Sequence, residues 1–185
     1  MLPAASGPLV LIGLMATGKS TVGRRLASRY GLRFVDTDAE IVSRHGPIPE
    51  IFANDGEPAF RRLEAETAAE VFSSADSATV ISLGGGAVLD ERTQQLLASA
   101  FVVFLDADLA TVLPRLAGDT GRPLLAGDAA ETWTRLDRER RPLYEALADA
   151  VIDTRNASPD TVVDRLEAQL RRTKFPEERI LGNDR

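Results

Sequence analysis

The sequence has no cysteine, one histidine and few aromatic residues, which make up 5% of the chain. Without cysteine, a disulfide framework and a cysteine-based metal or redox centre are both excluded. The single histidine, His45, has no second histidine with which to bind a metal, so we expect no catalytic role for it. Because the chain has no disulfide to maintain, we expect the protein in the reducing cytoplasm.

Long apolar runs and an excess of basic residues are also missing. No apolar run approaches the about 20 residues that a membrane-spanning helix needs, so no membrane contact is expected. The 22 Lys and Arg residues are outnumbered by 28 Asp and Glu residues, which gives a net charge of −6. This balance argues against a nucleic-acid-binding surface. An anionic ligand must therefore be held by a few well-placed arginines.

A chain of 185 residues, 44% of them hydrophobic, is long enough for one well-buried core and too short for two. We therefore expect a single domain over residues 1–172, followed by a polar tail over residues 173–185. The apolar residues before position 13 are interpreted as the first strand and not as a cleaved signal, because cleavage would remove the motif described next. We also expect a monomer.

The strongest motif is the segment Gly13–Ser20, Gly-Leu-Met-Ala-Thr-Gly-Lys-Ser, which matches the phosphate-binding pattern G-x-x-x-x-G-K-S/T. It follows the apolar run Leu9–Ile12 and precedes a helical pattern. Its glycines let backbone N–H groups close around an anion. Lys19 supplies a positive charge for the β- and γ-phosphates, and the Ser20 hydroxyl is placed to bind Mg²⁺. The residues expected to contact the nucleotide are Gly13, Ala16, Thr17, Gly18, Lys19, Ser20 and Thr21.

Short apolar runs alternate with helical patterns along the chain. The expected strands are Leu9–Gly13, Leu32–Val35, Thr79–Leu83, Phe101–Leu105 and Ala150–Ile152. The expected helices are Lys19–Tyr30, Ala59–Ser73, Glu91–Ala98, Leu109–Leu116, Ala130–Ala148 and Asp160–Arg172. Continuous apolar runs are typical of strands buried on both faces of a parallel sheet. The alternation predicts an α/β fold: a three-layer α/β/α sandwich with a central parallel sheet of about five strands and ligands at their carboxyl ends.

Three segments interrupt this alternation. An insert over about residues 38–62 contains the Gly- and Pro-rich stretch His45–Glu57, which we expect to form a helical lobe beside the active site. The triple glycine Gly84–Gly86 directly follows the third expected strand. Residues 117–128 contain three glycines around Arg122-Pro123, which suits a hinged lid.

Two carboxylates in Asp36-Thr37-Asp38 come at the end of the second expected strand. In a parallel sheet that end faces the same crevice as the phosphate loop, so both carboxylates are placed near the metal and the transferred phosphoryl group. One of the two is placed to hold the metal, directly or through water, and the other to hydrogen-bond and deprotonate the attacking hydroxyl. The alternative is that Asp38 is simply the N-cap of the following helix.

Arginines at separate points of this acidic chain are candidate anion ligands: Arg61, Arg122 and Arg140. Beside a triphosphate site, one arginine would neutralise the transferring phosphate and the others would grip a substrate carboxylate. The alternative for Arg61 is local pairing with Glu57 or Glu64, which lie at helical spacing from it. Two other large side chains, Trp133 and Tyr144, are interpreted as packing residues.

These motifs together resemble the shikimate kinase family, small P-loop kinases of aromatic amino-acid (chorismate) biosynthesis. The resemblance runs from about Val10 to Leu170, with six motifs in order at the spacing of the family. They are Gly13–Ser20 continued by Thr21-Val22-Gly23, Phe34–Asp38 for D-S/T-D, Ile51–Arg61 for I-F-x-x-x-G-E-x-x-F-R, Leu83–Gly86 for the triple glycine, Arg122–Leu125 for the lid, and Glu139–Tyr144 for E-R-x-P-L-Y. The resemblance implies a P-loop NTPase fold with a substrate-binding insert and a lid. It also implies ATP-dependent phosphorylation of a ring hydroxyl of shikimate, giving shikimate 3-phosphate and ADP.

The resemblance further implies roles for single residues. Lys19 and Ser20 would bind the ATP phosphates and Mg²⁺, with Asp36 reaching the metal indirectly. Asp38 would hold the ring hydroxyl and act as the base. Arg61 and Arg140 would clamp the substrate carboxylate.

The remaining implied contacts involve the triple glycine, the lid and the last strand. Gly85, with Gly84 and Gly86 beside it, would donate a backbone N–H to a ring hydroxyl, which requires close approach without a side chain. Arg122 would close with the lid over the ATP phosphates and act in catalysis beside Lys19 and Asp38. Arg155, after the last strand, would contact the adenine.

Other functions remain open on the sequence alone. A kinase for another polyol, such as gluconate or an aminocyclitol precursor, shares the phosphate loop and differs in the acceptor pocket. A non-catalytic nucleotide-binding module uses the same fold, but it has no need of Asp38 and Arg122. An adenylate-kinase-like enzyme is disfavoured, because the insert carries the pattern of Ile51–Arg61 and no recognisable nucleoside-monophosphate site.

Overall fold

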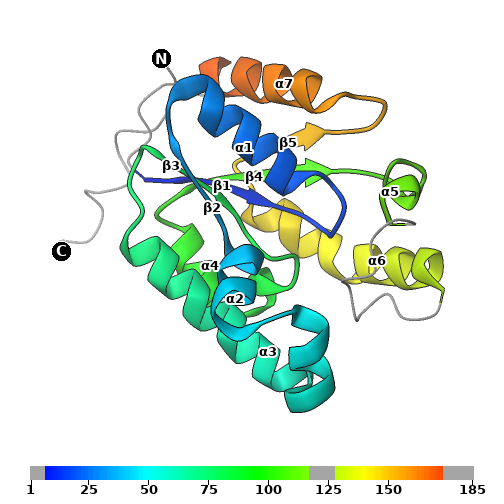
Figure 1. Cartoon of the computed structure of the whole chain (residues 1–185). Helices are drawn as coiled ribbons and strands as arrows, with labels where there is room; N and C mark the ends of the chain where they lie inside the picture. Colours follow the sequence, from blue (N-terminus) through cyan, green and yellow to red (C-terminus); the bar gives the residue numbers. More distant parts are fainter. Residues whose placement is uncertain (1–6, 117–127, 173–185) are drawn as a thin grey trace, which may run out of the picture.

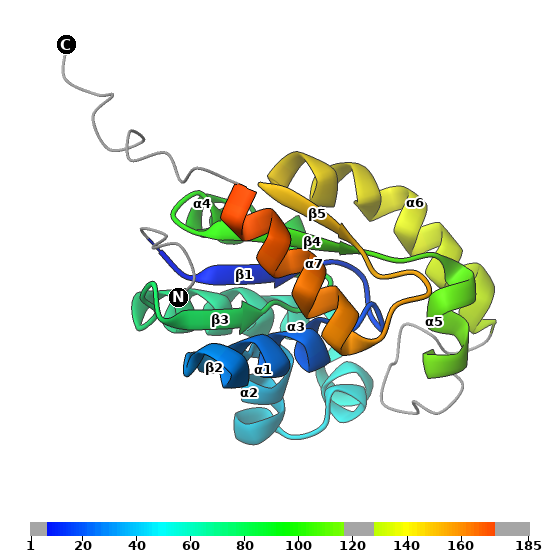
Figure 2. The same ribbon diagram turned by 90° about the horizontal axis from the view of Figure 1, so that it is seen from above.

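A five-stranded parallel sheet lies at the centre of the computed structural model, which describes residues 7–116 and 128–172. Its strands are β1 (Leu9–Ile12), β2 (Arg33–Asp36), β3 (Thr79–Ser82), β4 (Phe101–Asp106) and β5 (Ala150–Asp153), in the order β2-β3-β1-β4-β5 (Figure 2). In the register, Leu11 of β1 pairs with Ser82 of β3, and Ser82 pairs with Asp36 of β2. The carboxyl ends of these three strands therefore lie side by side, where an open parallel sheet binds its ligands.

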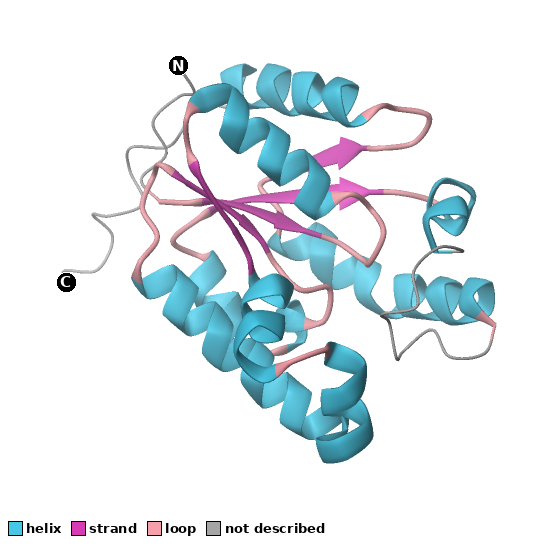
Figure 3. Ribbon diagram, in the orientation of Figure 1, coloured by secondary structure: helices cyan, strands magenta, loops and turns pink. Residues whose placement is uncertain are grey.

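Helices cover both faces of the sheet (Figures 1 and 3). They are α1 (Lys19–Tyr30), α2 (Thr37–His45), α3 (Ile48–Ser73), α4 (Glu91–Leu97), α5 (Leu109–Leu116), α6 (Ala129–Leu147) and α7 (Pro159–Arg172), with a short 3-10 helix η1 (Ala87–Leu89). Helices α1 and α7 lie on one face, and α3, α4 and α6 lie on the other (Figure 1). The expected three-layer α/β/α sandwich is confirmed.

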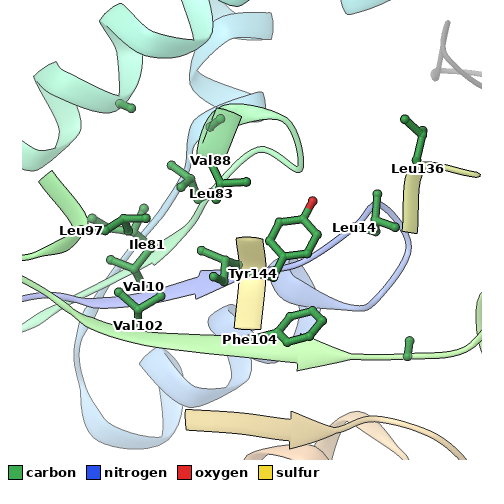
Figure 4. Close-up of a cluster of buried hydrophobic side chains, with 14 of the residues drawn as sticks. Val10, Leu14, Ile81, Leu83, Val88, Leu97, Val102, Phe104, Leu136 and Tyr144 are labelled. Carbon is green, nitrogen blue, oxygen red and sulfur yellow. The ribbon is translucent and has the colours of Figure 1, made fainter. Parts of the chain in front are cut away.

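The core consists of two main layers because successive strand residues point to opposite faces. Leu9 and Leu11 of β1 join the cluster under α1 and α7, whereas Val10 and Ile12 join the cluster under α3, α4 and α6. Figure 4 shows part of the second cluster, including Val10. Strand β1 is buried along its whole length, so the phosphate loop that follows it starts from a fixed point.

The two edge strands differ from the expectation of burial on both faces. In β5, Val151 and Asp153 are exposed, and Val151 retains 52% of its accessible surface. In β2, Arg33 is exposed and only Val35 is buried. Each of these edge strands has one sheet neighbour, so the prediction of burial on both faces holds for β1, β3 and β4 and is wrong for β2 and β5.

The insert is helical, as predicted, but its helices begin earlier than the sequence indicates. Thr37–His45 forms α2, with His45 as its last residue, and the helix predicted from Ala59 begins at Ile48. Helix α3 bends at Gly56, whose φ of 79° is not helical. The insert also has its own small core, formed by Ile41, Ile51 and Phe60 with Ile48, Phe52 and Leu63.

Some expectations fall outside the described residues. These are Arg122 and the lid predicted over residues 117–128, of which only Asp128, the N-cap of α6, is described, together with the tail over residues 173–185 and the first six residues. Within the described part of the chain, no helix combines the length and the apolar character needed to cross a bilayer.

Candidate active site

The phosphate loop joins the end of β1 to the start of α1. Gly13 and Gly18 have φ values of 137° and 101°, which favour glycine, and Ala16 also lies in the left-handed region at 63°. The Lys19 ammonium group donates to the carbonyl oxygens of Gly13 at 2.8 Å and Leu14 at 2.9 Å. The loop is thus curled around the side chain that the sequence predicts for phosphate binding.

Two side chains from later helices hold the loop by its carbonyl groups. Arg115 in the last turn of α5 donates to the carbonyl oxygen of Ala16 at 2.9 Å. The indole N–H of Trp133 on α6 donates to the carbonyl oxygen of Met15 at 3.2 Å. Trp133 is buried, as its interpretation as a packing residue requires, but it also binds the phosphate loop.

A cavity of about 410 Å³ opens above the loop. It is lined by Met15, Ala16, Gly18, Lys19, Ser20, Thr21, Asp38, Ser82, Gly85 and Arg115. Five of the described residues predicted for the phosphoryl donor, Ala16, Gly18, Lys19, Ser20 and Thr21, therefore share one cavity with Asp38 and Gly85, which are predicted for the acceptor. Donor and acceptor groups from four separate sequence segments meet there.

Oxygen atoms suited to a hard cation lie on one side of this cavity. The hydroxyl oxygens of Ser20 and Ser82 are 3.4 Å apart, and Ser82 is the register partner of Asp36. The described residues contain no group of three or more acidic, His or Cys side chains that could hold a metal alone. A hydroxyl with one carboxylate nearby fits Mg²⁺, which keeps several waters and binds substrate phosphates in place of a full set of protein ligands.

The helix cap at this point is Asp36 and not Asp38. Asp36 Oδ1 accepts from the backbone N–H of Asp38 at 3.1 Å and of Ala39 at 3.2 Å, which fixes the start of α2. The alternative that Asp38 is the N-cap is therefore wrong, and its carboxylate faces the cavity. Asp36 thus caps α2 and is also the register partner of Ser82 in the sheet.

The triple glycine lies under the acceptor side of the site, and each of its members meets a different side chain. A Cβ atom added to Gly84 would lie 2.7 Å from Asp38 Oδ1 and 2.6 Å from Glu64 Oε1. A Cβ atom on Gly86 would overlap the guanidinium of Arg61. The carbonyl oxygen of Gly85 accepts from Tyr144 Oη at 2.5 Å and from Arg140 at 3.3 Å.

Arg61 is held by the two glutamates that the sequence offers as local partners. Its guanidinium donates to Glu64 at 2.6 Å and to Glu57 at 2.9 and 3.2 Å. Burial opposes the charge of Arg61, but the two carboxylates outweigh it, and the pKa of the guanidinium is raised. Arg61 therefore pairs with its local glutamates and also lies next to Gly86.

Glu64 is a buried acid that sequence reasoning considered only as a surface partner. It retains 2% of its accessible surface. Burial raises the pKa of its carboxyl group above the ordinary 4.5, Arg61 opposes this shift, and the nearby charge of Asp38 adds to it. The signal in the sequence was its position one helical turn after Arg61, on the same face of α3.

Another cavity, of about 220 Å³, also borders the phosphate loop. Its lining includes Thr17, Gly18, Arg115 and Pro159, and Arg115 also borders the first cavity. Arg155, which the sequence predicts beside the adenine, pairs instead with Asp153 at 2.8 Å and Asp106 at 3.6 Å and does not line this cavity. Arg115 was missed because it carries no motif of its own.

Comparisons with known proteins agree with the family that the motifs indicate. A family model described as shikimate kinase matches residues 15–171. A shikimate kinase of Mycobacterium avium is 47% identical over 163 residues, which cover 87% of this chain and 92% of that protein. The structure of a shikimate kinase from Acinetobacter baumannii in complex with shikimate has a TM-score of 0.84 and 33% identity, covering 91% of this chain and 95% of that one.

A kinase of a different substrate has the same fold. A gluconokinase from Sinorhizobium meliloti has a TM-score of 0.61 and 21% identity, covering 91% of this chain and 93% of its own. At this identity the likeness reflects the fold alone.

Proposed function

The chain belongs to the shikimate kinase family, and we propose that it transfers the γ-phosphoryl group of ATP to shikimate in the cavity between the phosphate loop and Gly85. The observation that carries this proposal is the shared cavity of about 410 Å³, which Lys19, Ser20, Asp38 and Gly85 line together. A phosphoryl donor and a hydroxyl acceptor bound there would be in direct reach of each other. The reaction belongs to aromatic amino-acid biosynthesis.

On the donor side, the loop N–H groups and Lys19 would bind the β- and γ-phosphates. Phosphoryl transfer depends more on position and charge than on covalent chemistry, so Lys19 contributes by stabilising the charge that develops on the phosphate oxygens. Arg122, outside the described residues, is proposed to join it from the lid and to exclude water, which would otherwise accept the phosphate. The adenine is assigned to the cavity beside Arg115 and Pro159.

Ser20 is proposed to hold Mg²⁺, with Asp36 acting directly or through water. When bound, the ion would neutralise phosphate charge and orient the triphosphate. Asp36 is suited to this position because one of its oxygens is fixed by the two N–H groups of α2, which sets the direction of the carboxylate. Both residues lie at the end of the sheet that carries the loop.

On the acceptor side, Asp38 is proposed to accept the proton of the attacking 3-hydroxyl group. Its carboxylate is half-buried and faces both the cavity and the triple glycine. Arg61 and Arg140 are proposed to bind the substrate carboxylate, and the N–H groups of Gly85 and Gly86 to bind ring hydroxyls. Because Glu57 and Glu64 already orient Arg61, little of its conformational entropy is lost when the substrate binds.

The substrate is the feature that an assay tests most directly. ADP release is measured with ATP, Mg²⁺ and either shikimate, gluconate or a cyclitol without a carboxyl group, and NMR identifies the phosphorylated position. We expect turnover with shikimate and a phosphate on its 3-hydroxyl group. Faster turnover of gluconate would indicate a polyol kinase, and nucleotide binding without turnover of any acceptor would indicate a binding module. We further propose that the enzyme acts as a cytoplasmic monomer.

A further inference from the structure

Three consecutive glycines make a poor platform for a substrate unless the surrounding structure fixes them. Glycine has more backbone freedom than any other residue and loses more conformational entropy when it is ordered. The segment Gly84–Gly86 is therefore positioned by what binds its peptide groups from outside. The adjoining helix η1 does so locally, because the N–H groups of Ala87 and Leu89 bind the carbonyl oxygens of Gly84 and Gly86 at 3.1 and 2.9 Å. Two elements more distant in the sequence also do so.

On one side, the buried Thr37 at the start of α2 accepts the N–H of Gly84 at 2.9 Å. On the other side, α6 supplies two donors to the carbonyl oxygen of Gly85, Tyr144 Oη at 2.5 Å and Arg140 at 3.3 Å. The N–H groups of Gly85 and Gly86 donate no hydrogen bond to any residue within the described part of the chain. The bonds from Thr37 and α6 thus leave these two N–H groups available to a ligand.

We propose that the Tyr144 hydroxyl is a positioning group for the acceptor substrate, an inference that rests on the proposed function. Its bond to the carbonyl oxygen of Gly85 sets the plane of the Gly85–Gly86 peptide and so aims the Gly86 N–H, which points away from that oxygen. This is also the shorter of the two hydrogen bonds that the carbonyl oxygen of Gly85 accepts. Arg140, which is proposed to bind the substrate carboxylate, donates to the same oxygen at 3.3 Å and interacts with the Tyr144 hydroxyl, so this hydroxyl also helps to place its guanidinium.

The tyrosine is itself rigid, as a positioning group must be. Its side chain is fully buried and stacks on Phe104, with ring centroids 5.3 Å apart and an interplanar angle of 26°. Figure 4 shows the two rings one above the other, with the Tyr144 hydroxyl directed away from Phe104. Burial raises the pKa of this hydroxyl to about 12, so it remains a protonated donor at physiological pH. Its role is therefore to donate a hydrogen bond and not to exchange a proton with the substrate.

The test is Tyr144→Phe, which removes the hydroxyl and keeps the ring on Phe104. The chain has one other tyrosine, Tyr30, whose hydroxyl interacts with Glu167 and Arg171 at the surface, so Tyr30→Phe is a matched control. We expect Y144F to raise the KM for shikimate about tenfold, as the loss of one buried hydrogen bond predicts, and to leave the KM for ATP within about twofold. Y30F should leave both KM values and kcat as in the wild type.

A pH series separates positioning from acid–base chemistry. Because the hydroxyl does not titrate in the range of the assay, the ratio of the two KM values for shikimate, Y144F over wild type, should be constant from about pH 6 to about pH 9. A ratio that varies with pH as one ionisation would overturn the positioning role.

The remaining outcomes are distinct. Lack of shikimate turnover by the wild type would refute the proposed function, whereas a wild-type KM for shikimate in an active Y144F would refute only this inference. Equal increases of both KM values with a lower melting temperature would mean that the hydroxyl serves stability alone. If Y144F does not fold, NMR of the wild type decides: the Tyr144 hydroxyl proton should shift when shikimate is added, and no shift would overturn the inference.

Discussion

The carboxylates of Asp38 and Glu64 approach the same backbone atom, the Cα of Gly84, from two different helices. Only a hydrogen atom on that carbon leaves room for both. The two negative charges repel each other, and the guanidinium of Arg61, bound to Glu64, partly offsets the repulsion. The base and the carboxylate clamp of the proposed mechanism are therefore parts of one charge cluster.

Replacing Gly84 by alanine should disrupt this cluster. The new methyl group would lie within 2.7 Å of both carboxylate oxygens and would displace them. We expect kcat/KM for shikimate to fall about 100-fold, because a displacement near 1 Å is enough for such a loss. A folded G84A variant whose kcat/KM for shikimate stays within about threefold of the wild type would contradict the steric argument.

Replacing Asp38 by asparagine should remove the proposed base and retain the shape of the side chain. We expect kcat to fall about 100-fold or more, which is the range of general base catalysis, with ATP affinity and the melting temperature unchanged. Steady-state kinetics and calorimetric titration with ATP measure both effects. Turnover at the wild-type rate would exclude Asp38 as the base.

Replacing Arg61 or Arg140 by alanine should selectively weaken the binding of the carboxylated substrate. Loss of a charged hydrogen bond costs about 2 kcal/mol, which corresponds to about a 30-fold higher KM for shikimate. The control is Arg135→Ala on α6, because Arg135 is exposed and pairs only with Glu139, at 3.0 Å, among the described residues. If both site variants instead lost ATP affinity, the acceptor site would be misplaced.

Arg115 and Arg155 are the two candidates for the adenine side, and we expect opposite results when each is replaced by alanine. Arg115 borders both cavities and binds the phosphate loop, so Arg115→Ala should raise the KM for ATP about tenfold and change the KM for shikimate little. Arg155 is occupied by Asp153 and Asp106, so Arg155→Ala should leave both values near the wild type. The reverse pattern would restore the assignment of Arg155.

Glu64 should make the stability of the fold depend on pH. Burial raises its pKa above the ordinary 4.5, so above that pH the folded state holds a proton that the unfolded chain has released. Unfolding then releases a proton, and the contribution of Glu64 to the free energy of unfolding decreases as pH rises through the raised pKa. Urea unfolding of the wild type and Glu64→Gln over a pH series measures this. The wild type should lose stability relative to E64Q from about pH 4.5 upward, and a gain would contradict the assignment.

Much of the fold follows from local sequence. The strand β1, the phosphate loop and the helix Lys19–Tyr30 were predictable because an apolar run, a motif and a glycine at each helix boundary coincide. The helical character of the insert was predicted, but the bounds of its helices were not, because Gly56 and the neighbouring prolines suggest breaks. They fold as helices around the apolar side chains that they bury, and this packing outweighs the local signals.

Some residues of the site were likewise predictable from sequence motifs, and others were not. Lys19, Asp38 and Gly85 belong to motifs, and all three line one cavity. Glu64 and Arg115 act through contacts that the fold creates, with Gly84 and with the carbonyl oxygen of Ala16, and neither contact has a sequence pattern. Side chains that bind main-chain groups far away in the sequence are the part of the site that required the structure.

Helix α6 contacts both loops of the site, Met15 through Trp133 and Gly85 through Tyr144 and Arg140. A ligand bound at one loop would restrain α6. Less conformational entropy of α6 would then be lost when the second ligand binds at the other loop. ATP and shikimate should then bind cooperatively. By thermodynamic linkage, the factor by which ATP raises the affinity for shikimate must equal the factor by which shikimate raises the affinity for ATP.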